Sequence, residues 1–203
     1  MTIEVQKYDL IDYSIFESEK DYDYYLWHPD DNYIVLGRAN KPDIALETNL
    51  VEQDNVKVYK RPSGGETVIL TPNTLVISVK VKIGNELNTQ KYFREINDKI
   101  MDALSSLGVK NLSMKGISDI SIGDKKILGS SIYLRKKTLF YHAVLNISES
   151  IDFISKYIKH PTKEPDYRKG RSHKEFVTSL SEQGYNLKHD QIIPALNTTL
   201  SLN

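Results

Sequence analysis

The sequence predicts an α/β fold in which mixed β-sheets pack with helices on one side. Residues 75–83 alternate apolar and polar side chains, which is typical of a half-buried strand. Residues 89–107 carry apolar side chains at three- and four-residue steps, which indicates an amphipathic helix capped by Asn88 or Thr89. Residues 118–147 hold three runs of β-formers joined by short turns, so we expect a meander there.

The remaining elements follow from shorter patterns. Runs of β-branched and aromatic residues predict strands over residues 22–27, 33–36, 56–59, 67–70 and 109–114. Helices are expected over residues 42–50, 151–158, around 176–180 and over 190–202, with the last one interrupted by Pro194. We expect one domain over residues 1–203, in which 163–203 form a C-terminal loop and helical extension.

Composition excludes several classes of protein. The chain has 27 basic and 27 acidic residues, so no excess charge draws it to nucleic acid or to an anionic membrane. No apolar run approaches the roughly 18 residues of a membrane span, and the first residues lack a secretion signal, so we expect a cytoplasmic protein. The chain has no cysteine, which rules out a thiol nucleophile and thiolate metal sites.

The segment from Lys60 to Val79 is the candidate ligand site. Gly64 and Gly65 allow a turn with positive φ and a close approach of a ligand to backbone N–H groups. Arg61 offers a fork of donors for a carboxylate or phosphate. The residues are consistent with an anion cradle, but taken alone they favour an ordinary glycine turn between strands.

This segment resembles a family signature. Arg61-x-Ser63-Gly64-Gly65 is similar to the Arg-Arg-x-Ser-Gly-Gly-Gly-Ala motif of the lipoate–protein ligases. Two further blocks resemble that family in the same order, residues 34–38 upstream and residues 118–131 downstream. The resemblance covers about residues 22–147. It implies the catalytic-domain fold shared by lipoate ligases, octanoyltransferases and biotin ligases, without the small C-terminal domain that many lipoate ligases carry.

The resemblance also implies a reaction. Such an enzyme activates lipoate or octanoate with ATP and Mg²⁺, and then transfers the acyl group to a lysine of a lipoyl domain. The absence of cysteine fits this route, since the related octanoyltransferases work through a cysteine thioester.

Site residues follow by matching the blocks. Lys126 is implied as the catalytic residue, donating to the acyl carbonyl and the α-phosphate. Asp119 is implied as a Mg²⁺ ligand, or else it caps a turn. Residues implied to bind substrate or nucleotide are Arg38, Arg61, Ser63, Gly64, Gly65, Asn73, Asp119, Gly129, Ser130 and His142. A surface role remains open for Arg38, and a structural role is favoured for His142.

Departures from the family pattern keep other functions open. Glu66 replaces a glycine and places a carboxylate beside the cradle, Leu70-Thr71 replace a His-Asp pair, and Ser118 replaces an asparagine. We expect weak activity from the isolated chain unless a neighbouring cation neutralises Glu66. The alternatives are a non-catalytic relative that binds an acyl ligand or a lipoyl domain, a ligase completed by a separate small-domain subunit and, less favoured, a biotin ligase.

The segment from Lys163 to His173 concentrates Arg168, Lys169 and Arg171. We expect it to fold over the site or to dock an acidic acceptor domain, and reversal of the charge at Arg168 and Arg171 to weaken acceptor binding.

Overall fold

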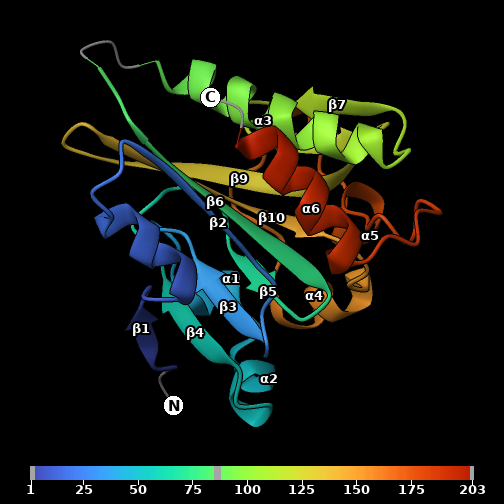
Figure 1. Cartoon of the computed structure of the whole chain (residues 1–203). Coiled ribbons are helices and arrows are strands. Elements are labelled where there is room, and N and C mark those ends of the chain that lie inside the picture. The colour runs from blue at the N-terminus through green and yellow to red at the C-terminus, as the bar shows by residue number, and fades with distance from the viewer. Residues whose placement is uncertain (1–2, 85–87, 202–203) are drawn as a thin grey trace.

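The computed structural model describes residues 3–84 and 88–201, and it contains two β-sheets (Figure 1). The larger sheet is antiparallel throughout. Its strands, in spatial order, are β2 (Tyr22–Trp27), β6 (Thr74–Lys82), β10 (Thr138–Asn146), β9 (Lys125–Arg135), β8 (Asp119–Ile122) and β7 (Leu112–Lys115). The expected meander is β8, β9 and β10, with turns at the predicted places.

The smaller sheet is mixed and packs against the inner face of the larger one. Its order is β1 (Val5–Lys7), β4 (Lys57–Lys60), β3 (Tyr33–Leu36) and β5 (Val68–Leu70). Strands β1 and β3 run parallel to β4, and β5 runs antiparallel to β3. An apolar cluster that includes Tyr8, Val35, Leu70 and Val76 joins the two sheets. The site residues described below lie along this junction.

Two long helices cover the outer face of the larger sheet. They are α3 (Thr89–Ser106) and α6 (His189–Leu200). The Asn88 side chain caps α3 by accepting a 3.0 Å hydrogen bond from the backbone N–H of Lys91, as the pattern predicted. The stripe predicted to be apolar is buried at Ile96, Ile100 and Leu104, so this helix is part of the core.

Shorter helices complete the molecule. The outer side of the smaller sheet packs against α1 (Pro42–Ala45), α2 (Thr48–Gln53) and α4 (Ile151–Tyr157). The 3₁₀ helices are η1 (Ile11–Glu17) and η2 (Asp166–Arg168), and α5 spans His173–Phe176. The layers are therefore helix, larger sheet, smaller sheet and short helices (Figure 1), and the expectation of helices on one side was too simple.

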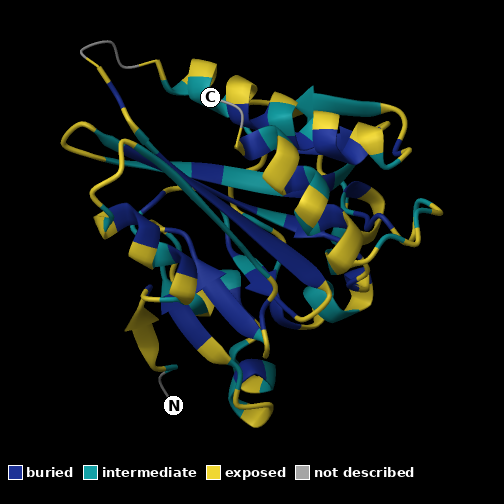
Figure 2. Cartoon of the chain, viewed as in Figure 1, coloured by how far each residue is buried: buried dark blue, intermediate teal, exposed yellow. Residues whose placement is uncertain are grey.

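Strand β6 differs from its prediction as a half-buried strand. Leu75, Ile77 and Val79 face the helix-covered core as expected. The polar face is buried too, with Ser78 at 0% and Lys80 at 5% exposure, as the dark strand in Figure 2 shows. The reason is that η1 and its neighbouring segment cover this face, where Ser78 donates to Asp12 at 2.7 Å and Lys80 donates to the carbonyl of Ser18.

Three helices also differ in their bounds or continuity from those predicted. The predicted helix over 42–50 is broken into α1 and α2 because Leu46 is extended and Glu47 donates its N–H to the Tyr157 carbonyl at 2.9 Å. The helix around 176–180 ends at Phe176, since Val177 pairs with β9. Pro194 lies inside α6 without interrupting it, because the buried side chains of that helix hold it on the sheet; the predicted end at Leu202 lies outside the described residues. Among the described residues, no helix combines the length and apolarity that a membrane crossing requires.

Candidate functional site

Lys126 lies at an irregularity in the β8–β9 pairing. Ile120 pairs with Leu128 and Ser121 with Lys126, so Ile127 is an extra residue on β9. Such a bulge re-aims a side chain relative to a regular strand. The Lys126 ammonium lies 2.8 Å from the Asp119 carboxylate on β8, and the side chains are 27% and 9% exposed. The carbonyl of Lys126 accepts the N–H of Thr178 at 2.9 Å, which anchors the strand from its other side.

Gly129 provides the space in which the Lys126 side chain lies. A Cβ atom at Gly129 would lie 2.6 Å from the Lys126 Nζ and 2.7 Å from its Cε. Real Cβ atoms essentially never approach other heavy atoms this closely, so any larger residue would displace the ammonium. The glycine three residues after the lysine is therefore explained by local geometry.

Asp119 is buried between two partners. Its Oδ1 faces Lys126, and its Oδ2 accepts a 2.8 Å hydrogen bond from the Tyr167 hydroxyl. Both carboxylate oxygens are thus engaged, and no cluster of three or more His, Cys, Asp or Glu side chains suited to a metal occurs among the described residues. A Mg²⁺ ion bound at Asp119 would have to share the carboxylate with Lys126 and Tyr167, and this role of Asp119 stays a prediction.

Arg61 is turned inward upon its own loop. Its guanidinium donates to the carbonyls of Val35, Gly64 and Glu66 at 3.1, 2.8 and 2.8 Å. Burial lowers the pKa of Arg61 to about 10, partly offset by the nearby charge of Glu66. In this structure Arg61 shapes the cradle and its donors are occupied by backbone carbonyls.

The glycine turn is built by close packing. Gly65 has φ of +86°, which glycine adopts without strain. A Cβ atom at Gly37 would lie only 1.9 Å from the carbonyl oxygen of Gly65, so Gly37 must lack a side chain. The Arg38 N–H donates to the Ser63 carbonyl at 2.9 Å, which ties the two loops together.

Ser63 connects the cradle to the larger sheet. Its hydroxyl lies 2.7 Å from the His142 Nε2 on β10 and 3.0 Å from the Ser131 hydroxyl on β9. Burial, with the charge of Arg61 second, lowers the pKa of His142 to about 3, so the imidazole is neutral at ordinary pH. This geometry agrees with the favoured structural role of His142, although its ring also lines a cavity.

Glu66 is bonded to the neighbouring loop. Its carboxylate accepts a 3.2 Å hydrogen bond from the Asn40 side chain, and its backbone carbonyl accepts from Arg61. The carboxylate therefore has a neutral hydrogen-bond partner in Asn40, while the charge of the nearby Arg61 interacts with it through space.

Three predicted residues lie apart from the others. Arg38 is exposed, and its side chain lines neither of the two cavities described below. Asn73 donates to Glu149 at 3.1 Å and supports the β5–β6 turn. Gly64 is exposed, with open space around it. By contrast, the structure brings Arg61, Gly65, Asp119, Gly129, Ser130 and His142 together around one cavity, with Lys126 among them.

That cavity lies between the two sheets and measures about 560 Å³. We call it the inter-sheet cavity. Its buried lining includes the apolar Tyr8, Val35, Leu70 and Val76 beside the polar Arg61, Ser131 and His142. Its exposed residues are Gly65, Gly116, Ile117 and Asp166. Its volume is in the range typical of small-molecule sites.

A second cavity, of about 280 Å³, lies on the other side of β5. We call it the cationic cavity, because five basic side chains and a single carboxylate, that of Glu66, line it. The basic residues are Lys41, Lys126, Lys159, Lys163 and Arg168. Both cavities share Glu66, Lys126, Gly129 and four neighbours, so they meet at the lysine.

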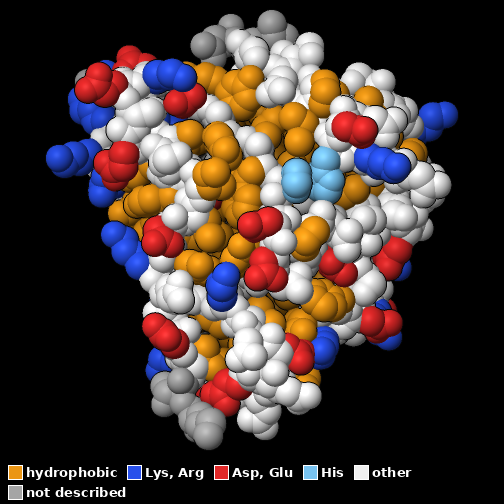
Figure 3. All heavy atoms as spheres, turned by 60° about the horizontal axis from the view of Figure 1, so that its bottom comes forward, with side chains coloured by type: hydrophobic (Ala, Val, Ile, Leu, Met, Phe, Trp, Pro, Cys, Tyr) orange, Lys and Arg blue, Asp and Glu red, His pale blue; other side chains and the backbone are white. Residues whose placement is uncertain are grey.

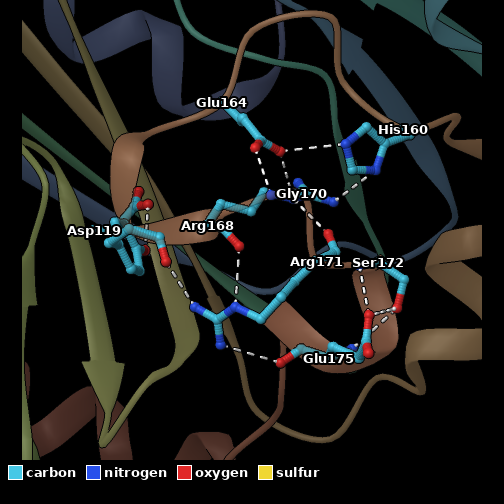
Figure 4. Close-up of polar contacts among 9 residues, drawn as sticks. Asp119, His160, Glu164, Arg168, Gly170, Arg171, Ser172 and Glu175 are labelled. Atoms are coloured by element: carbon cyan, nitrogen blue, oxygen red, sulfur yellow. Dashed lines mark hydrogen bonds and ion pairs between the residues drawn. The ribbon is translucent and has the colours of Figure 1, made fainter.

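The segment from Ile158 to Val177 lies against both cavities, as expected of the Lys163–His173 loop. Pro165 lines both, and Tyr167 reaches Asp119. In Figure 4, Glu164 lies between His160 and the backbone of Gly170. Sequence reasoning missed Tyr167 and Tyr8, because an isolated tyrosine carries no local signal of the long-range contact it makes.

Two arginines of this segment are bound within it. Arg168 is 5% exposed, donates to the Arg171 carbonyl at 2.9 Å and lies over the Phe176 ring. Arg171 donates to the carbonyls of Arg168, Asp124 and Tyr167. Because these guanidiniums bind the segment itself, they do not form the free docking patch that the sequence suggested.

The class of protein now follows. Residues 10–201 match the model of the lipoyl protein ligase A/B catalytic domain. The chain belongs to this family, as the resemblance of its three sequence blocks implied.

Solved structures of several ligases resemble the chain. A bipartite lipoate protein ligase of Thermoplasma acidophilum, described with its E2 lipoyl domain, has a TM-score of 0.78 at 17% identity over 99% of this chain and 83% of that one. A lipoate–protein ligase A bound with ATP has a TM-score of 0.78 at 18% identity, over 99% of this chain and 85% of that one. P. falciparum LipL1 in complex with lipoate has a TM-score of 0.71 at 16% identity. The match covers 98% of this chain and 59% of that one. At these identities the likeness shows the fold, which confirms the predicted fold class.

Proposed function

We propose that this chain activates lipoate or octanoate with ATP and transfers the acyl group to a lysine of a lipoyl domain. The observation that carries the proposal is the meeting at Lys126 of two cavities, one of which is lined by more basic side chains than the other. A reaction that joins an acyl carboxylate to a nucleotide is favoured when both are held side by side with a cation at the reacting atoms. The solved relatives described with ATP and with lipoate support these two substrates.

The charges assign each substrate to a cavity. The cationic cavity suits the phosphates of ATP, because its lining basic residues outnumber its one carboxylate five to one. The inter-sheet cavity suits the acyl chain, since an apolar cluster forms part of its buried wall and its lining carries three carboxylates against two basic residues. The carboxylate head would then lie at the junction.

Lys126 acts at that junction. As the substrate carboxylate attacks the α-phosphate, pyrophosphate leaves and negative charge builds on the phosphoryl oxygens, which the ammonium stabilises. Asp119 and Tyr167 hold the ammonium in place before substrate arrives. The acceptor amine then attacks the acyl carbonyl, and AMP leaves with its phosphate still facing Lys126. We assign no step to Mg²⁺, which remains an expectation from the family.

The partner is a lipoyl-domain protein. One structural relative is a bipartite ligase described with its E2 lipoyl domain, which supports both this partner and a separate ligase subunit. A non-catalytic relative that only binds an acyl ligand or a lipoyl domain is the alternative, favoured by Leu70 and Thr71 in place of the family's His-Asp pair.

Mass spectrometry of an acceptor tests the proposal. The chain is incubated with a lipoyl domain, ATP, Mg²⁺ and either octanoate or lipoate, with and without a separate small-domain subunit. We expect the acceptor to gain the mass of one acyl group at its lysine, and no gain when ATP is omitted. An acceptor that stays unmodified in every mixture, while the chain still binds octanoate, would favour the non-catalytic relative.

A further inference from the structure

A buried carboxylate lies next to the closed end of the inter-sheet cavity. Asp12 on η1 is 0% exposed, and its Oδ1 accepts a 2.8 Å hydrogen bond from the Tyr8 hydroxyl. Its Oδ2 accepts a 2.7 Å hydrogen bond from Ser78 on β6. Burial raises the pKa of Asp12 to about 6, so keeping this carboxylate inside is costly. The reaction proposed above makes no use of it, which calls for another role.

The Asp12 contact fixes the position of the Tyr8 ring. The backbone N–H of Tyr8 donates to the Lys60 carbonyl at 3.1 Å, which extends the β1–β4 pairing and brings the ring between the sheets. The ring packs edge-on against His142 at a centroid distance of 5.9 Å. With backbone, ring and hydroxyl each held by a different element, Tyr8 cannot swing aside without breaking the bond to Asp12.

The burial of the cavity lining places Tyr8 at the closed end. The exposed residues of the lining, Ile117 and Asp166 among them, mark the mouth. Tyr8, Val35, Leu70 and Val76 are each at most 2% exposed and belong to one apolar cluster. An acyl chain that enters with its carboxylate at Lys126 therefore points its tail toward these residues.

We propose that Tyr8, positioned by Asp12, is the end wall of the acyl site and sets the longest acyl chain that the protein accepts. This inference rests on the proposed function and deepens it. A tail that stops short of the ring leaves part of the apolar wall uncovered, and a longer tail must displace a ring held by three anchors. The accepted substrates are therefore carboxylates up to one limiting chain length.

The test measures binding, so that it does not depend on turnover. Non-hydrolysable acyl-sulfamoyl adenylates with hexanoyl, octanoyl, decanoyl, dodecanoyl and tetradecanoyl chains are titrated by calorimetry into the full chain. For the wild type we expect the affinity to fall at least tenfold once the acyl chain exceeds the longest length that the site accepts. Tyr8→Ala should move that limit upward by two carbons or more, because it removes the end wall.

Further variants separate this role from a general effect on stability. Tyr8→Leu keeps an apolar but smaller side chain at the end wall, so this variant should also raise the limit of chain length. It replaces Tyr8→Ala if the alanine variant fails to fold. Asp12→Ala releases the Tyr8 ring, so the fall in affinity with chain length should become less steep. Asp12→Asn keeps an acceptor for the Tyr8 hydroxyl and should preserve the wild-type limit. Folded Tyr8 variants with the wild-type limit would overturn the inference, and a wild type that binds none of the analogues would instead overturn the proposed function.

Discussion

At the scale of single residues, the Lys126 side chain depends on the absence of a side chain at Gly129. We expect Gly129→Ala to push the ammonium away from Asp119, since the new methyl would lie 2.6 Å from Nζ. Acyl transfer, measured by acceptor mass, should fall at least tenfold, which corresponds to about 1.4 kcal/mol of lost transition-state stabilisation. Gly84→Ala is the control, because a Cβ at Gly84 meets nothing within 4 Å. Equal activity of the two variants would contradict this dependence.

Glu66 gives the second prediction at this scale. Its carboxylate is bonded to Asn40, and the Arg61 guanidinium donates to its backbone carbonyl. Because the carboxylate already has a hydrogen-bond partner in Asn40 and the Arg61 charge lies nearby, we expect Glu66→Gly to change the affinity for an acyl-adenylate analogue by less than about threefold, under 1 kcal/mol. Calorimetric titration of both proteins measures this. A large gain in the glycine variant would show that the carboxylate does obstruct the ligand.

His142 gives a prediction about acid stability. Its folded-state pKa, about 3, lies below the ordinary 6.5, so the neutral imidazole stabilises the fold above pH 6.5. As the pH falls below 6.5 the unfolded chain binds a proton that the folded chain does not, and stability drops by about 1.4 kcal/mol per pH unit.

The variant His142→Gln should lose that part of the pH dependence. The free energy of unfolding is measured by denaturant titration between pH 7 and pH 4 for both proteins. Asp12 and His173, which also titrate with shifted pKa values, are present in both, so the difference between the two curves isolates His142. Parallel curves would mean that the imidazole takes up its proton in the folded state.

At the scale of elements, the segment from Ile158 to Val177 holds itself together. Arg168 is buried and bonded to the Arg171 carbonyl, with Glu164 at 3.5 Å and the Phe176 ring beneath it. Reversing a buried and paired charge typically costs several kcal/mol. We therefore expect Arg168→Glu to lower the midpoint of thermal unfolding strongly.

The neighbouring Lys169→Glu is a matched control. Lys169 is exposed in the same segment, so its reversal should leave the thermal midpoint nearly unchanged. Calorimetric melting of the three proteins decides between a structural segment and a docking patch. If Arg168→Glu kept the wild-type midpoint and only raised the Michaelis constant for the acceptor, the segment would be a docking surface after all.

Elements with a strong local pattern were predictable from sequence. Helix α3 shows its apolar stripe and its cap in consecutive residues, and the strands of the meander alternate with turn residues. The burial of both faces of β6 was not predictable, because Ser78 and Lys80 look like solvent-facing residues until their distant partners Asp12 and Ser18 are placed. The same holds for α5, whose end depends on a bridge to β9.

At the scale of the whole molecule, the site is a junction of distant segments. The sequence blocks pointed to Lys126, Asp119 and the glycine turn, and the structure places these together between two cavities. The division into two sheets, and with it the two cavities, has no signature in any one stretch. Charges of both signs are spread over the face seen in Figure 3, in keeping with the balanced composition.

The central claim is that Lys126 serves both substrates where the cavities meet. Calorimetric titration of a non-hydrolysable octanoyl-adenylate analogue into the wild type, Lys126→Met and Lys125→Met tests it directly. Lys125 is the matched control, because its ammonium lies 3.4 Å from the Lys174 carbonyl and its side chain lines neither cavity. We expect Lys126→Met to weaken binding about a hundredfold, or about 3 kcal/mol, and Lys125→Met to match the wild type. Equal affinities in all three proteins would contradict the account.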